Sequence, residues 1–341
     1  MSIVGAFDVH RRQLTFDYLD TVTGEVKRGR VVPADREHLR AWLARFAGQD
    51  DVHFALEGCT GWRYVTEELA AKGIIPHLAE PADTAALRGR KRHAKTDKTD
   101  SRHLRVHLAA GDLPECWLPP GHVLETRATV RLYKDLLDER GAWHQRIAAT
   151  LFHQGVPVTA SMSTAQGRAA VAEMELSPAG RQAVGTALRQ IGRLTGELDP
   201  LHRQLDMISR RQPGCRALRA TQFGIGPVTS VAIWAELGDV RRFGNSGDVI
   251  RHTGLDITVY SSDGKRSAGH LSRQGPQLLR WALYEAAKCA ARPAAPDYGY
   301  YTAARDRRTG GLATLSVARK LARRCYHTLR ELGEEALAPA A

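Results

Sequence analysis

Four acidic residues in the first hundred positions of the 341-residue chain stand where chemistry could use them. Asp8 comes near the end of a short apolar run, and Glu57 closes a second run in which apolar and polar residues alternate. Asp97 and Asp100 open a helical pattern, and a spacing of three puts both on one helical face. Four converging carboxylates repel one another unless a cation neutralises them. Oxygen-only ligation suits Mg²⁺ or Mn²⁺, and a pair of such ions activates attack on a phosphodiester.

Each of these acids also has an ordinary structural explanation. An Asp after a strand is commonly a turn residue, and Asp97 is the kind of first-turn acid that a helix macrodipole favours. Residues 88–107 weigh against that explanation, because they hold eight basic residues and only two acids. The eight are Arg88, Arg90, Lys91, Arg92, Lys95, Lys98, Arg102 and Arg105. A basic stretch around acids predicts a phosphate track with a metal site inside it; the alternative is a helix that merely faces solvent.

The elements that must position the acids alternate between strand and helix patterns over the first 80 residues. Expected strands cover residues 3–9, 14–19, 26–32, 51–57 and 74–78, and expected helices begin near residue 33 and cover 62–71. Three strands in a meander, followed by alternating helix and strand, indicate a mixed sheet with helices on its faces. This is the ribonuclease H-like order, in which the first and fourth strands are neighbours. Asp8 and Glu57 are then expected at the same edge.

A helical arm is expected after Pro119 and Pro120. Residues 123–151 have a helical pattern, and a second run forms a heptad seam of under three repeats from Ile191 to Ile208. Pro200 inside that run predicts a break or kink, and residues 156–178 predict a loop. The resulting antiparallel hairpin suits a bundle core and a dimerisation arm equally well. The fold class is therefore α/β plus α, with a mixed-sheet domain at 1–120, a coiled-coil-like arm at 121–212, a mostly helical domain at 213–332 and a tail at 333–341.

The composition is that of an ordinary globular protein with a basic excess. Lys and Arg total 49 against 37 Asp and Glu, which gives a formal charge of +12 and a pI near 9.8. A hydrophobic content of 43% excludes a disordered or collagenous chain, and the basic balance favours a nucleic-acid partner. No apolar run approaches the roughly 18 residues of a membrane span, and no signal peptide is evident. Five scattered cysteines without a CxxC motif indicate neither disulfides nor zinc, so cytoplasmic localisation is expected.

A polar, turn-rich segment at residues 254–266 carries two adjacent serines, Ser261 and Ser262. A serine is a weak nucleophile until a neighbouring base or a lowered pKa activates it. The segment has no GxSxG elbow and no Ser-His-Asp order, so its chemistry alone favours loop residues over nucleophiles. Upstream, Gly224-Ile225-Gly226 precedes Pro227 at an expected helix start. It either presents backbone N–H groups to a phosphate or is simply a turn.

Seven segments of the chain resemble the DEDD transposases of the insertion sequence 110 family. They are residues 4–10, 55–62 and 95–100, and then 224–227, 235–243, 254–262 and 270–275. The resemblance covers nearly the whole chain in the right order. It implies a RuvC-like N-terminal domain, a helical arm and a C-terminal transposase domain with a nucleophilic serine. It also implies guidance by a structured noncoding bridge RNA that pairs with donor and target DNA.

Carried over residue by residue, the resemblance makes Asp8, Glu57, Asp97 and Asp100 a metal-binding catalytic tetrad and Ser262 the nucleophile. The family pattern usually has Gly after the serine, whereas this chain has Asp263. Asp256 stands where a proline is common, and Phe7 where isoleucine is usual. The change at position 263 leaves Ser261 as the alternative nucleophile.

The activity that the resemblance implies is recombination by phosphoryl transfer, with Mg²⁺ or Mn²⁺ at the tetrad. Candidates for binding nucleic acid are Arg90, Lys91, Arg92, Lys95 and Lys98 near the tetrad, and Lys265, Arg266, Arg273 and Arg280 near the serine. Because serine and tetrad fall in separate domains, either interdomain folding or a partner subunit must bring them together. The resemblance implies the second, so a homo-oligomer, dimer or tetramer, is expected. Two alternatives stay open. One is a metal-dependent endonuclease of the Holliday-junction type, which would survive loss of the serine, and the other is a non-catalytic nucleic-acid-binding protein.

Overall fold

The structure is a computed structural model of the chain, and it describes residues 1–87, 97–157, 164–258, 261–262, 265–266 and 269–339. The chain divides into two compact units, Met1–Leu118 and Pro119–Ala341. The division of the second unit into an arm and a C-terminal domain, expected from the sequence, stays a prediction.

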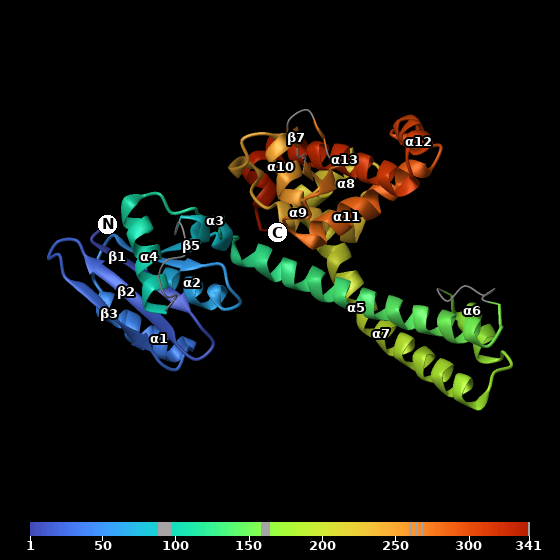
Figure 1. Cartoon of the computed structure of the whole chain (residues 1–341), viewed down its shortest axis with the longest axis horizontal. Helices are drawn as coiled ribbons and strands as arrows, with labels where there is room; N and C mark the ends of the chain where they lie inside the picture. Colours follow the sequence, from blue (N-terminus) through green and yellow to red (C-terminus); the bar gives the residue numbers. More distant parts are fainter. Residues whose placement is uncertain (88–96, 158–163, 259–260, 263–264, 267–268, 340–341) are drawn as a thin grey trace. The chain divides into compact units, whose positions relative to one another are not determined.

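The first unit is built on a five-stranded mixed sheet with the strand order β3-β2-β1-β4-β5 (Figure 1). Its strands are β1 (Ile3–Val9), β2 (Leu14–Asp20), β3 (Val26–Val31), β4 (Val52–Glu57) and β5 (Ile75–Ala79). The first three form an antiparallel meander, and β4 runs parallel to both β1 and β5. The mixed sheet and its ribonuclease H-like order are therefore confirmed.

The sheet buries different side chains on its two faces, because successive residues of a strand point to opposite sides. The helices of the unit are α1 (Arg36–Leu43), η1 (Ala44–Phe46), α2 (Trp62–Ala71), α3 (Pro81–Ala86) and α4 (Asp97–Ala110). Odd-numbered residues of β1, such as Phe7, pack in an aromatic core with Trp42 of α1. Even-numbered residues, such as Ala6, pack with Leu104 of α4. Asp8 therefore belongs to the face that α4 covers.

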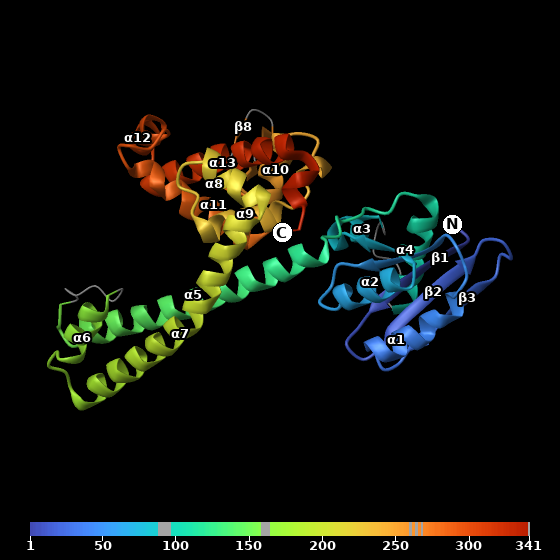
Figure 2. The same cartoon turned by 180° about the vertical axis from the view of Figure 1, so that it is seen from behind.

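The second unit begins with a helical arm (Figure 2) formed by α5 (Gly121–His153), α6 (Ala165–Ala172) and α7 (Pro178–Arg211). Helices α5 and α7 run antiparallel and pack against each other. The short helix α6 corrects the loop expected over 156–178. Of the break or kink predicted at Pro200, the break is wrong, since α7 continues through this residue, and the kink stays a prediction. The seam stays buried on both sides, at Leu198 and Leu205, and this packing outweighs the one hydrogen bond that proline cannot donate.

Contacts at both ends of the arm hold its helices in place. At the far end, Ile147 and Leu151 of α5 form a small core with Val184 of α7. Near the start of α5, the guanidinium of Arg127 donates from Nε to the carbonyl oxygen of Ala235, 2.8 Å away.

A helical bundle completes the second unit. It comprises α8 (Pro213–Thr221), α9 (Pro227–Leu237), η2 (Val240–Arg242), α10 (Ser246–Thr253), α11 (Gln277–Ala287), η3 (Lys288–Ala291), α12 (Tyr298–Arg307), α13 (Gly310–Leu332) and η4 (Gly333–Leu337). Helix α9 is buried all round, and α5, α7, α8 and α11 contact it. Its Trp234 donates from Nε1 to the carbonyl oxygen of Ala336, 2.6 Å away, which holds the C-terminal turn. Among the described helices, none is both long and apolar enough to cross a membrane.

Four short strands follow α10 where the sequence predicted only turns. They are β6 (Ile257–Thr258), β7 (Ser261–Ser262), β8 (Lys265–Arg266) and β9 (His270–Leu271). Strand β6 pairs antiparallel with β9, and β7 pairs antiparallel with β8. We call the segment from Ile257 to Leu271 the serine hairpin. The polar composition concealed these strands, because alternation of apolar and polar residues is the usual sign of a strand.

Candidate active site

The acids predicted on the first and fourth strands lie on neighbouring strands. Strands β1 and β4 are parallel, and Phe7 is paired with Leu56. Asp8 and Glu57 each follow that pair by one residue. The residues two positions earlier in each strand, both alanines, lie in the core on the α4 side. By the alternation of a strand, both acids belong to the α4 face, at the carboxyl ends of their strands.

Helix α4 brings the other two acids to this edge. The buried residues of its sheet-facing side are Ser101, Leu104, Arg105 and Leu108. Asp97 and Asp100 continue that side into the first turn, since helical residues three or four apart share a face. The partial positive charge of a helix N-terminus favours carboxylates there. Because α4 packs on β1, β2 and β4, the two acids lie over the sheet.

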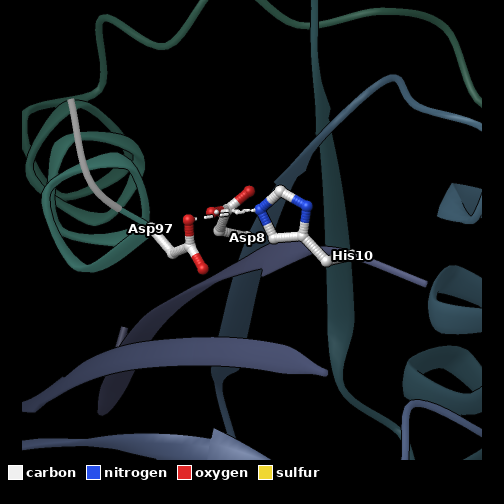
Figure 3. A group of neighbouring side chains, drawn as sticks. All are labelled: Asp8, His10 and Asp97. Carbon is white, nitrogen blue, oxygen red and sulfur yellow. Dashed lines mark hydrogen bonds and ion pairs between the residues drawn. The ribbon is translucent and has the colours of Figure 1, made fainter. Parts of the chain in front are cut away.

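His10 contacts two of the carboxylates through one ring nitrogen (Figure 3). Its Nε2 is 3.0 Å from Oδ2 of Asp8 and 3.5 Å from Oδ1 of Asp97. The side chain of Gln13 donates from Nε2 to Oδ2 of Asp97 at 2.9 Å. One ligand atom from each of Asp8, His10 and Asp97 lies within 4.8 Å of the others. Carboxylates from β1 and α4 thus meet in one small cluster.

The charge environment of Asp8 includes both acids of α4. Burial raises the pKa of its carboxyl group, and the neighbouring His10 acts in the opposite direction. The negative charges of Asp100 and Asp97 raise this pKa further. Three of the four predicted tetrad residues therefore share one electrostatic environment, and Glu57 stands at the end of the adjacent strand.

The chemistry of these donors fits a divalent cation. Carboxylate oxygens are the ligands that Mg²⁺ and Mn²⁺ prefer. A cation among the acids also relieves the mutual repulsion that raises the pKa of Asp8. Asp8 and Asp97 would supply the oxygens, with the imidazole of His10 beside them.

His10 and Gln13 carried no predicted role. His10 follows Asp8 by two residues, the spacing that keeps side chains on one face of a strand. The backbone N–H of His10 donates to the carbonyl oxygen of Gln13 at 3.0 Å, which closes the turn between β1 and β2. The sequence signal that could have identified His10 and Gln13 was their position in the turn that follows Asp8, a candidate metal ligand.

Comparison with known proteins indicates the family of the chain. A DEDD transposase model of insertion sequence 110 elements, described as "Transposase", matches residues 6–153, which include all four acids. A second model, "Transposase IS116/IS110/IS902 family", matches residues 216–301, which include both serines. The chain belongs to the IS110 family of transposases. It is accordingly an enzyme that cuts and rejoins DNA.

Two curated relatives are similar over most of this transposase. A probable family 20 transposase of Pseudomonas aeruginosa is 25% identical over 286 residues, covering 79% of this chain and 81% of that protein. A transposase for the insertion sequence element IS1328 of Yersinia enterocolitica is 23% identical over 239 residues, covering 69% of each chain.

Only part of the basic stretch predicted around the tetrad can be located in the transposase. Arg90, Lys91, Arg92 and Lys95 lie outside the described residues. Lys98 is exposed on α4 and lines a cavity of about 480 Å³ together with Arg28 and Arg30 of β3. Arg105 corrects the prediction of a continuous phosphate track. It is buried and its Nε donates to Asp17, so its charge neutralises a buried carboxylate instead of facing a phosphate.

The serine hairpin of the transposase pairs each candidate nucleophile with a basic residue in backbone register. Ser262 is opposite Lys265 and Ser261 is opposite Arg266. Residues 263–264, which join the paired strands, lie outside the described residues. Both serines belong to the second unit, and the four acids belong to the first.

The two other predicted phosphate ligands lie just after the serine hairpin. Arg273 is exposed. Arg280 donates from Nη1 to the carbonyl oxygens of Thr253 at 3.2 Å and Gly275 at 2.9 Å. Burial lowers the pKa of Arg280, and the positive charge of Arg273 lowers it further, so the two guanidinium groups are neighbours.

The Gly224-Ile225-Gly226 motif of the transposase is a turn. Gly224 has φ +88°, and a Cβ added there would lie 2.5 Å from the carbonyl oxygen of Ala286. The N–H of Gly226 donates to Oγ1 of Thr229 at 2.9 Å. This N–H group caps α9 and is not presented to a phosphate, so the structure favours the simpler of the two interpretations.

Proposed function

We propose that this transposase recombines DNA through Ser262, with a divalent cation, Mg²⁺ or Mn²⁺, at the tetrad of Asp8, Glu57, Asp97 and Asp100. The observation that carries the proposal is the meeting of Asp8 and Asp97, whose oxygens lie within 4.8 Å of a shared histidine nitrogen. A purely structural acid has no need of a second carboxylate at this distance, because like charges raise its free energy.

In the proposed reaction, Oγ of Ser262 forms a bond to the phosphorus of a DNA phosphodiester. The bond from phosphorus to the 3′ oxygen breaks, and the proton of the serine hydroxyl is transferred to that oxygen. The products are a phosphoserine and a free 3′-hydroxyl. A 3′-hydroxyl then attacks the phosphoserine of the partner strand, which rejoins the DNA and restores the serine hydroxyl. A cation bound by the tetrad would supply electrostatic stabilisation of the leaving oxygen.

The transposase's own side chains orient the groups that react. His10 and Gln13 hold the carboxylates of Asp8 and Asp97 in fixed positions. Lys265, Arg266, Arg273 and Arg280 are proposed to bind phosphates beside the serine, and Arg90, Lys91, Arg92, Lys95 and Lys98 those beside the tetrad.

The partners of the reaction are donor and target DNA and a bridge RNA that selects them. The serine and the acids belong to different units of the chain, so interdomain folding or a partner subunit must bring them together. On the family resemblance we infer the second, a homo-oligomer that is a dimer or tetramer. We also propose a three-part organisation with a coiled-coil-like arm, with boundaries at 1–120, 121–212 and 213–332. A cytoplasmic compartment, expected from the cysteine pattern, is proposed as well.

The decisive experiment traps the covalent intermediate. The native transposase, with bridge RNA and a nicked DNA substrate, is expected to accumulate a protein–DNA adduct that survives denaturation. Ser262→Ala should lose both adduct and recombination while keeping nucleic-acid binding, because one hydroxyl contributes little to a large charged interface. Ser261→Ala is the matched control and should be mild. An adduct that persists in Ser262→Ala and vanishes in Ser261→Ala would move the nucleophile by one residue.

The tetrad is tested by replacing its acids singly with alanine and by chelation. Each change should abolish adduct formation while the fold persists, because removing a carboxylate relieves repulsion in the metal-free protein. Near-normal cleavage by any of these variants would remove that residue from the tetrad. Metal-dependent cutting with no adduct in the native protein would instead favour the endonuclease alternative.

A further inference from the structure

A pocket of about 640 Å³ lies at the base of the serine hairpin, entirely within the second unit. Strands β6 and β9 form one wall, and α12 and α13, which pack against each other, form the other. Ligand pockets for single small molecules have about 300–1,000 Å³. The volume therefore suits one nucleotide and excludes a turn of duplex.

Three guanidinium groups line the pocket. Arg319 donates from Nε to the carbonyl oxygen of Leu255 at 2.6 Å, and Arg307 donates from Nε to that of Ala303 at 3.0 Å. Each is thus held by a backbone group. Burial lowers the pKa of Arg319, and the charge of the third guanidinium, Arg308, also lowers it, so like charges are close together here.

The charge of these guanidinium groups is only partly offset by the described residues. In the part of the chain that the structure describes, no carboxylate forms an ion pair with Arg307, Arg308 or Arg319. The charge of Asp256 offsets part of that on Arg319, but Asp256 is itself hydrogen-bonded by the hydroxyl of Ser272. Clustered guanidinium groups lower their free energy by binding an anion, and phosphate is the anion that their planar geometry matches.

The same pocket exposes apolar surface. Ile257 is 49% exposed, Leu312 is 44% exposed and Tyr300 is 42% exposed. The ammonium group of Lys320 lies 4.2 Å from the centroid of the Tyr300 ring and is paired with Asp297, which fixes the ring's orientation. Unpaired bases stack on such aromatic and apolar surfaces, and arginines bind the flanking backbone.

We propose that this pocket binds an unpaired nucleotide of the DNA strand that Ser262 attacks. The base lies against Tyr300 and Leu312, and the phosphate lies at Arg307, Arg308 and Arg319. The inference rests on the proposed function in one respect, the identity of the strand. Thr258 ends β6, the strand that forms a wall of the pocket, and Ser262 follows four residues later. An extended chain of that length spans at most about 14 Å. A strand cut at Ser262 therefore passes within a few nucleotides of the pocket.

The test measures the affinity of the full-length chain for a labelled 12-nucleotide single strand of DNA over a series of salt concentrations. Arg308→Ala should weaken binding and reduce the slope of log affinity against log salt by about 0.7, the value for one neutralised phosphate on a single strand. Tyr300→Ala should weaken binding by about tenfold with the slope unchanged, because stacking releases no counterions. Tyr300→Phe, which keeps the ring, should bind normally.

Arg305→Ala is the matched control, since Arg305 is exposed on the same helix, pairs with Asp306 and does not line the pocket. Leu312→Asp provides a second variant at an exposed position and should weaken single-strand binding, because it adds a negative charge to the pocket. Melting temperatures identify any variant that fails to fold. Binding of the same strand as a duplex should be unaffected by all of these changes.

Pocket variants that bind as the Arg305→Ala control does would overturn the inference. So would equal losses for single strand and duplex, or losses confined to an RNA strand of the same sequence. The binding assay needs no cleavage and can be run with Ser262→Ala. If pocket variants form the adduct normally and keep single-strand binding, the pocket proposal is wrong and the serine mechanism stands. If the pocket binds the single strand but the native chain forms no adduct, the serine mechanism is wrong and the pocket proposal stands.

Discussion

Asp17 provides a test of how α4, and with it Asp97 and Asp100, is held on the sheet. The Asp17 side chain is 1% exposed and accepts hydrogen bonds from two guanidinium groups. The Arg105 side chain, on α4, is 9% exposed. The Arg28 side chain, on β3, lies 2.6 Å away and is 51% exposed. The Asp17 carboxylate thus forms one buried ion pair, with Arg105, and one ion pair that solvent screens, with Arg28.

The two ion pairs should differ several-fold in free energy. Breaking a buried pair costs about 3–5 kcal/mol, because the remaining charge is left uncompensated. An exposed pair contributes about 0.2–1 kcal/mol. We therefore expect Asp17→Ala to lower the unfolding free energy of the first unit by about 3–5 kcal/mol and Arg28→Ala by at most about 1 kcal/mol. The double variant Asp17→Leu, Arg105→Met should recover most of the loss, since an apolar pair of similar volume needs no compensation.

Hydrogen exchange of the β1 and β2 amides measures this free energy for the first unit alone. An unfolding free energy lowered no more by Asp17→Ala than by Arg28→Ala would contradict the expected difference between the two ion pairs. So would a double variant as unstable as Asp17→Ala, because the loss would then come from packing and not from an unpaired charge.

Three further predictions concern binding and stability. Neutralising Arg90, Lys91 and Arg92 together should reduce the slope of log affinity for duplex DNA against log salt concentration. The reduction should be about 0.9 for each phosphate that the protein no longer neutralises. An unchanged slope would show that these side chains face solvent. Hydrogen bonds from Arg324 and Lys320 lower the pKa of Asp297, so its contribution to stability is complete above about pH 4 and is lost at lower pH; the difference in urea midpoint between the native chain and Asp297→Asn should shrink below pH 4. Gly254→Ala should lower the melting temperature more than Gly24→Ala, because both have positive φ, but only at Gly254 would the new Cβ lie 2.2 Å from a carbonyl oxygen.

The sheet of the first unit was predictable because its strands carry the information locally. Alternation in β2 and β4 indicated strand type and burial together, and the meander followed by alternating helix and strand indicated the order. The placement of Asp8 and Glu57 followed from that order alone. The contact of His10 with Asp97 did not, because it depends on how far α4 advances over the edge of the sheet, and no local pattern determines that distance.

The local structure was less predictable from the sequence in segments whose conformation depends on polar residues. The serine hairpin pairs short polar strands, which have no apolar alternation to reveal them. Arg105 reads as a member of a basic run, yet its position one turn beyond Ser101 on the buried side of α4 directs it to Asp17. The break, one of the two outcomes predicted at Pro200, did not form, because the propensity of one residue competes with a buried seam along the whole of α7.

The arm has a mechanical consequence. Its attachment at Arg127 and its own core at the far end make α5 and α7 a stiff pair that meets the bundle at the buried helix α9. From Arg127 to His153 the helix extends about 40 Å at 1.5 Å per residue. A rotation of about 5° at the attachment then moves the far end by about 3 Å, by the same helical length. A contact made at the far end of the arm is therefore sensitive to small changes in the angle at which α5 leaves the bundle, because a few degrees there displace that contact by several ångströms.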